Sequence, residues 1–226
     1  MTQDTSTRPL IGVILLDTNF PRPPGDIGQA STFLRAGLAV RFLRVPQATA
    51  QRVVQQADPA LLQPFVKAAQ DLARDGASLI TTTCGFLARY QAALQAAVGV
   101  PVISSSLLLC RTLDRPGIVT FDAASLRDDV LHGAGVPIGT PVVGLEPGCA
   151  MQTAILGDRP DMDLKQAQND VVRAALQLID RHPEVRNIVL ECANMPPYRN
   201  PVEQATARKV HDLETLLLAR AKDGLR

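Results

Sequence analysis

Short apolar runs alternate along the chain with longer segments in which apolar residues recur every three or four positions. The apolar runs predict buried strands at residues 10–16, 40–45, 78–82, 100–103, 117–121, 142–145 and 188–190. The helical spacing predicts helices at residues 59–74, 86–97, 123–133 and 164–181, and residues 202–222 are expected to be largely helical. This alternation predicts an α/β fold with mainly parallel sheets.

The second half of this pattern repeats the first. Gly12 lies in the first apolar run and Gly117 opens the fifth, and each is followed at a nearly equal spacing by a cysteine, Cys84 or Cys192. The repeat predicts two pseudosymmetric Rossmann-like domains with the active site in the cleft between them. We expect the first domain at residues 1–108 and the second at 109–207, with a C-terminal helix at 208–226 packing on the first.

Cys84 and Cys192 each follow an apolar run and begin a polar turn. Ligands of open α/β sheets bind at the carboxyl ends of the strands, where these two thiols are expected. Either cysteine alone is typical of a buried core residue. Their matched spacing and polar flanks favour a catalytic pair, whereas Cys110 and Cys149 lack that context and are expected to be structural.

A thiol and a thiolate on opposite faces of a carbon could act as acid and base in a proton transfer. Cys84 precedes a predicted helix, so we expect the helix N-terminus to lower its pKa. Polar residues at the other strand ends would hold a substrate carboxylate, mainly through neutral donors, because no Lys or Arg stands at a predicted strand end. These residues are Asp17, Thr18, Asn19, Thr82, Thr83, Ser104, Ser105, Ser106, Thr120 and Asn194.

Three acidic residues near these positions have alternative interpretations. Asp26 lies in a loop rich in Pro and Gly, where it could satisfy backbone donors or form part of a lid over the substrate. Strand alternation predicts that Glu191 points away from Cys192 and has a structural role. Asp212, next to His211, could return to the cleft on a C-terminal helix, although a surface or capping role is favoured.

Bulk composition narrows the class of partner. The 226 residues carry a formal net charge of +1 and no Trp, so neither nucleic acid nor a membrane surface is an expected partner. The polar N-terminal segment lacks the apolar core of a signal peptide, which leads us to expect a cytoplasmic protein with reduced thiols. No Cys or His spacing predicts a metal site, and a homodimer is possible.

Three segments resemble the aspartate/glutamate/hydantoin racemase superfamily: PGDIG at residues 24–28, TTCGF at 82–86 and LECANMPPY at 190–198. The resemblance implies two α/β domains and a two-base mechanism without a cofactor, in which Cys84 and Cys192 are catalytic. It also implies substrate contacts at Thr83, Gly85, Ala193 and Asn194. Glutamate racemases carry Thr-His after the second cysteine, Asn-Thr after the first and Asp-Ser-Gly after the first strand. This chain departs at all three places, which argues against glutamate.

The sequence therefore predicts a racemase or epimerase acting on a small carboxylate substrate, either an amino acid or a hydantoin. One alternative is a cis–trans isomerase of the maleate type, because those relatives keep both thiols. Another is a two-lobed module that binds a small acid without turning it over. Arylmalonate decarboxylases of the superfamily lack the first thiol, so Cys84 argues against that activity.

Overall fold

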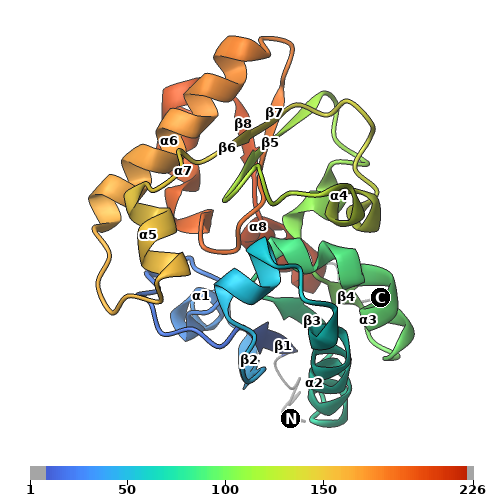
Figure 1. The fold of residues 1–226 in the computed structure, drawn as a ribbon. Helices are drawn as coiled ribbons and strands as arrows, with labels where there is room; N and C mark the ends of the chain where they lie inside the picture. Colours follow the sequence, from blue (N-terminus) through green and yellow to red (C-terminus); the bar gives the residue numbers. More distant parts are fainter. Residues whose placement is uncertain (1–8, 223–226) are drawn as a thin grey trace, which may run out of the picture.

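The computed structural model describes residues 9–222, and the segments 1–8 and 223–226 lie outside the described residues. It contains two four-stranded sheets, one above the other in Figure 1. The first has the order β2-β1-β3-β4, with β1 at Leu10–Leu15, β2 at Ala39–Arg44, β3 at Leu79–Thr82 and β4 at Val102–Ile103. The second has the equivalent order β6-β5-β7-β8, with β5 at Pro116–Thr120, β6 at Val142–Gly144, β7 at Asn187–Leu190 and β8 at Lys209–His211.

All the strand pairs within these two sheets are parallel. Helices cover the sheets, as expected for parallel sheets whose crossover connections return along the faces. The predicted α/β architecture with two pseudosymmetric domains is therefore confirmed.

Two glycines of the central strands explain part of the repeat. Gly12 of β1 pairs with Ile80 of β3, and Gly117 of β5 pairs with Ile188 of β7. A Cβ on Gly12 would lie 3.0 Å from the Cβ of Ala77, and one on Gly117 would lie 2.8 Å from a methyl of Val185. Glycine at these two positions lets the segment that covers each sheet pack closely against it. Because the two glycines pair at equivalent positions of β3 and β7, Cys84 and Cys192 follow the ends of these strands at the same distance along the chain.

The helices are α1 (Ala30–Leu34), α2 (Leu62–Arg74), α3 (Gln91–Ala96), α4 (Asp128–Ala134), α5 (Ala150–Leu156), α6 (Leu164–Arg181), α7 (Arg199–Thr206) and α8 (Leu213–Lys222). The long helices α2 and α6 each bury one apolar face, as their spacing predicts. A π-helical turn at Gln51–Gln55 and short 3-10 turns at Pro59–Leu61, Gly85–Tyr90, Ser106–Leu109 and Pro196–Tyr198 complete the elements.

Some predicted helices are wrong in extent. The helix expected at 123–133 begins only at Asp128, because the Asp122 carboxylate accepts from the Ala124 amide and the Ser125 hydroxyl and holds a turn. The helix expected at 86–97 begins as the 3-10 turn at Gly85–Tyr90. The sequence pattern did not predict α5.

The predicted C-terminal helix at 208–226 is also wrong at its start. Ala207 adopts a left-handed conformation with φ 52°, which ends α7, and β8 then joins the second sheet. Helix α8 follows, and its Leu213 and Leu217 lie in one apolar cluster with Ile11 and Leu79 of the first sheet. Figure 1 shows α8 between the two domains. The predicted domain boundary at 108/109 itself stays a prediction.

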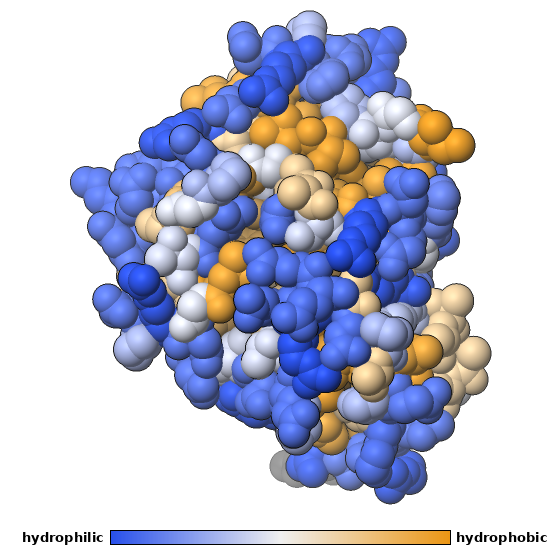
Figure 2. Space-filling view, viewed as in Figure 1, coloured by the Kyte–Doolittle hydropathy of each residue, from blue (hydrophilic) through white to orange (hydrophobic). Residues whose placement is uncertain are grey.

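The face drawn in Figure 2 is mostly hydrophilic, with hydrophobic residues gathered over the strands of the upper sheet. Within the part of the chain that the structure describes, none of the helices combines the length and the apolar character needed to cross a bilayer.

Candidate active site

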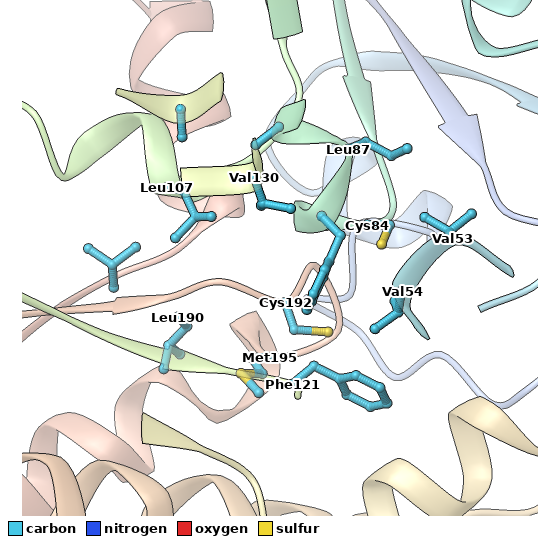
Figure 3. Close-up of a cluster of buried hydrophobic side chains, with 14 of the residues drawn as sticks. Val53, Val54, Cys84, Leu87, Leu107, Phe121, Val130, Leu190, Cys192 and Met195 are labelled. Atoms are coloured by element: carbon cyan, nitrogen blue, oxygen red, sulfur yellow. The ribbon is translucent and has the colours of Figure 1, made fainter. Parts of the chain in front are cut away.

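The repeat brings the two predicted catalytic thiols into one small, narrow cavity. Cys84 follows β3 and Cys192 follows β7, and both side chains are almost fully buried. Figure 3 shows the two sulfur atoms in the same space, near Val54 and Phe121. The cavity has a volume of about 20 Å³, enough for about one water molecule. A substrate therefore requires the site to open.

The walls of this cavity come from both domains. Half of the residues in the wall are large or small apolar ones: Leu16, Phe20, Ala50, Val54, Phe86, Phe121 and Ile155. The remainder consists of the two cysteines with Arg22, Thr83, Gly85, Glu191 and Asn194. Low polarity strengthens electrostatic interactions inside the cavity, so the few charged groups on its wall govern its chemistry.

Both thiols have raised pKa values, contrary to the expectation that a helix N-terminus lowers the pKa of Cys84. Burial, followed by the charge of Glu191, raises the pKa of Cys84 to about 12. The amides of Phe86 and Leu87 oppose this rise, as a helical turn should, but burial dominates. Burial and Glu191 also raise the pKa of Cys192 well above its ordinary value. The closed cavity therefore favours neutral thiols.

A hydrogen-bond chain joins the first domain to Cys192. Nη1 of Arg22 donates to Oδ1 of Asp26 at 2.9 Å, and Nδ2 of Asn194 donates to Oδ2 of the same carboxylate at 2.7 Å. The Cys192 thiol donates to Oδ1 of Asn194 at 3.4 Å. Asp26 is buried and accepts from the Gly28 amide at 2.7 Å, so it holds its own loop and also fixes Arg22 and Asn194.

Arg22 is a wall residue that the sequence pattern did not predict. Its Nη2 donates to Thr18 at 3.0 Å, and its guanidinium lies 4.3 Å from the centre of the Phe20 ring. Arg22 therefore adds one positive group to a wall on which mainly neutral donors were expected. Arg22 stands in the loop after β1 rather than at the strand end, and its i, i+4 spacing to Asp26 was the available signal.

Glu191 is the second wall residue that was missed. Its Oε2 accepts from the Thr120 hydroxyl at 2.9 Å and from the Phe121 amide at 3.3 Å. Thr83 occupies the equivalent place in the first domain, where its hydroxyl accepts from the Leu16 amide at 3.1 Å. Glu191 lies just beyond the end of β7 and is one of the residues of the cavity wall, and its bonds to Thr120 and Phe121 fit the structural role expected from the sequence.

The residue after Cys84 is shaped by Glu191. A Cβ on Gly85 would overlap both the main-chain oxygen and Oε1 of Glu191, so only glycine fits there. Glu191 is fully buried, and burial raises its pKa from 4.5 to about 7. Oε1 accepts no hydrogen bond from any residue in the described range 9–222. The site thus contains a carboxylate with one free oxygen.

Several other predicted substrate contacts do not line the cavity. Their polar groups form hydrogen bonds within the protein instead. The pairs are Thr82 with the Ser104 carbonyl, Ser104 with Gln91, Ser105 with the Leu107 amide, Ser106 with the Leu190 carbonyl, Thr120 with Glu191, and the Ala193 carbonyl with the Ile27 amide. These bonds hold the strand ends together and position the residues that do reach the cavity.

The predicted residues after β1 lie outside the cavity. Thr18 and Asn19 line an open groove of about 350 Å³ that shares Leu16, Phe20 and Arg22 with the cavity wall. Asp17 is partly exposed and pairs with Arg44 at 3.2 Å. Phe20 and Arg22 therefore lie between the outer groove and the thiol cavity.

One contact across the domains closes this wall. Asp158, in the connection between α5 and α6, accepts from the Phe20 amide at 3.2 Å and from the Asn19 side chain at 3.0 Å. Asp212, the other acid considered above, pairs with Arg199 at 2.8 Å and accepts from the Thr215 amide, so it caps α8 away from the cavity.

Solved structures share this architecture. Allantoin racemase from Pseudomonas fluorescens superposes with a TM-score of 0.64 at 19% identity, covering 95% of this chain and 89% of that one. Aspartate racemase from Picrophilus torridus gives a TM-score of 0.61 at 10% identity, covering 96% and 94%. The chain has the aspartate/glutamate racemase fold. Unliganded arylmalonate decarboxylase has the same fold, with a TM-score of 0.58 at 16% identity, covering 96% and 94%.

The curated proteins with similar sequences are dimethylsulfoniopropionate lyases. A dimethylsulfoniopropionate lyase of Durusdinium sp. clade D is 29% identical over 218 residues, covering 89% of this chain and 70% of that protein. Dimethylsulfoniopropionate lyase 7 of Emiliania huxleyi (strain CCMP1516) is 28% identical over 225 residues, covering 92% of this chain and 64% of the relative. The chain therefore spans only part of these longer relatives. No family model matches the chain.

Proposed function

We propose that this racemase-fold protein is a cofactor-independent enzyme that removes a proton from the carbon next to a substrate carboxylate, with Cys84 and Cys192 as its acid and base. The observation that carries the proposal is one narrow cavity with walls from both domains, lined by both thiols. A binding module needs no such pair, and a buried core cysteine needs no charged neighbours such as Arg22 and Glu191.

In the first step, one cysteine acts as a thiolate base. The C–H bond breaks, an S–H bond forms, and the electron pair is delocalised onto the substrate carboxylate. Arg22 is the positive group on the wall and is expected to face that carboxylate, where it would stabilise the developing charge. Asp26 keeps the guanidinium in place, and Asn194 orients the Cys192 thiol.

In a racemase or epimerase, the second thiol then donates its proton to the opposite face of the same carbon. Each cysteine thus acts as the base for one enantiomer and as the acid for the other. After one forward and one reverse reaction, both cysteines have regained their starting protonation states. Racemisation or epimerisation is the reaction that the two-thiol geometry supports best. We infer a small carboxylate substrate, such as an amino acid, because solved racemases that share this fold are named for small substrates such as aspartate.

A lyase is the second candidate, and the relatives that cover about nine tenths of this chain favour it. The same carbanion could instead expel a leaving group from the neighbouring carbon. With dimethylsulfoniopropionate, the C–S bond would break, dimethyl sulfide would leave with the electron pair, and acrylate would remain. This path needs one thiolate as the base and no second thiol to donate a proton to the carbanion.

Proton NMR in deuterated water separates these outcomes. The reduced protein is incubated with both enantiomers of several amino acids, 5-substituted hydantoins, maleate and dimethylsulfoniopropionate. Loss of an α-proton signal from both enantiomers supports a racemase, whereas acrylate and dimethyl sulfide signals support a lyase. Fumarate formed from maleate would indicate the isomerase. No change in any substrate would contradict an enzymatic role and favour a binding module.

A further inference from the structure

The carboxylate of Glu191 has no positive partner in the cavity. Within the described residues, the ionisable groups on the cavity wall are the two cysteines, Arg22 and Glu191. Arg22 is already paired with Asp26 at 2.9 Å. Arg89, which follows Cys84 along the chain, is buried beside Asp129 and does not line the cavity. The wall therefore carries one uncompensated acidic group.

The geometry fixes where this acid acts. Oε2 is held by Thr120 and by the Phe121 amide, which fixes the carboxylate of this wall residue in one position. Gly85 packs against the other side of the carboxylate, and Oε1 is left buried without a hydrogen bond in residues 9–222. A buried, unpartnered carboxylate oxygen is costly, and a ligand that supplies a donor or a positive charge would remove that cost.

We propose that Glu191 is the specificity-determining residue of the site, and that it selects carboxylate substrates that also carry a cationic group over neutral and dianionic ones. The proposal rests on the proposed function and deepens it. The substrate carboxylate faces Arg22, and its ammonium or sulfonium group faces Glu191. Apolar walls at Val54, Phe121 and Ile155 keep water away, so the attraction is strong. Hydantoins and maleate lack the positive group and bind weakly.

A cation in this position also favours catalysis. Burial and the Glu191 charge raise the pKa of both thiols, so a thiolate is unfavourable in the empty cavity. A positive group bound beside Glu191 offsets that charge and stabilises the thiolate that must act as base. The same residue would thus choose the substrate and make the base available only when that substrate is bound.

The test is binding of matched ligand pairs that differ in charge and hardly in shape. One pair is dimethylsulfoniopropionate and 4-methylpentanoate, and the other is 2-aminobutyrate and 2-methylbutyrate. Binding is measured by titration calorimetry on the Cys84→Ala/Cys192→Ala double variant, which cannot consume the ligands. We expect the cationic member of at least one pair to bind about tenfold more tightly or better, equivalent to about 1.4 kcal/mol.

Three further variants in that background assign the effect. Glu191→Gln keeps the shape and removes the charge, so the preference should fall below about threefold, and Glu191→Asp should restore part of it. Asp122→Asn is the matched control, because the Asp122 carboxylate lies near Glu191 in space but outside the cavity wall, and this variant should keep the preference. Thermal unfolding checks that each variant is folded.

Equal binding within both pairs, absence of binding by every ligand, or a preference that survives Glu191→Gln would each overturn the proposal. If Glu191→Gln does not fold, the affinities of the two ligands of each pair for the protein that retains Glu191 still test the predicted charge preference. The proposed function fails separately, through absence of exchange and of product in the wild-type protein. Turnover with no charge preference would refute the role of Glu191 alone.

Discussion

At the scale of single residues, Glu191 shows where pattern-based prediction stops. The sequence placed Cys84, Thr83, Cys192 and Asn194 at strand ends, and the structure brings all four to the cavity. It could not place Glu191, because strand alternation ends with β7 and the carboxylate is redirected by bonds from Thr120 and the Phe121 amide. Such long-range bonds leave no periodic signal in the sequence.

The raised pKa of Glu191 predicts how stability changes with pH. The folded protein holds this proton until pH about 7, whereas the unfolded chain releases it near its ordinary pKa of 4.5. Glu191 therefore contributes its full stability at low pH and loses it as the pH rises through 7. Relative to Glu191→Gln, the wild type should lose about 2–3 kcal/mol of unfolding free energy between about pH 5 and pH 8.

Urea unfolding of both proteins at the two pH values measures this difference. Asp161→Asn serves as a control in which an exposed acid outside the cavity wall is removed, and its curve should follow that of the wild type closely. Parallel pH dependence of wild type and Glu191→Gln would show that Glu191 is ionised normally in the folded protein.

At the scale of elements, the sequence predicted the framework well. Apolar runs located β1, β2, β3, β5, β6 and β7, and helical spacing located α2 and α6, because burial of these elements is continuous and periodic. The prediction failed where local side-chain hydrogen bonds or backbone conformation determine where a helix begins or ends. Asp122 delays α4, the left-handed Ala207 interrupts the C-terminal segment, and α5 has only a short apolar face.

The close packing of β1 against α2 predicts the cost of adding a methyl group at Gly12. An alanine Cβ would lie 3.0 Å from Ala77 and 3.1 Å from Leu72, so helix and strand must separate. Gly12→Ala should lower the unfolding free energy by about 1–3 kcal/mol. Gly99→Ala is the control: nothing lies within 4 Å of the added Cβ, so its effect should stay within about 0.5 kcal/mol.

Urea denaturation of the two glycine variants makes the comparison. Equal stability of Gly12→Ala and Gly99→Ala would contradict the packing argument, and with it the interpretation of Gly12 and Gly117 as equivalent positions of the two repeats.

At the scale of the whole molecule, both domains contribute to the wall around the thiols, and a hydrogen-bonded contact joins the domains beside that wall. The side chain of Asp158 in the second domain holds the Asn19–Phe20 segment of the first. Phe20 and Arg22 form the wall between the outer groove and the cavity. Substrate entry therefore requires this contact to loosen and the domains or the loop after β1 to move.

Removing the Asp158 side chain should open the site more often. Asp158→Gly is suitable because the residue has φ 46°, which glycine adopts without strain. In a Cys149→Ala background, which removes the half-buried thiol outside the cavity, modification by Ellman's reagent should become about threefold to tenfold faster. Asp161→Gly, in the same connection, should leave the rate unchanged. Equal rates in both variants would show that Asp158 does not hold the site closed.

The central claim is that both cavity thiols exchange a proton with the substrate, and deuterium incorporation into substrate carbon tests it most directly. With the substrate found in the NMR panel, the rate is measured for wild type, Cys84→Ala, Cys192→Ala and the control Cys149→Ala. For a racemase, we predict a loss of about 100-fold or more in each cavity variant and an unchanged rate in the control. Exchange at the wild-type rate in either cavity variant would contradict the two-thiol account.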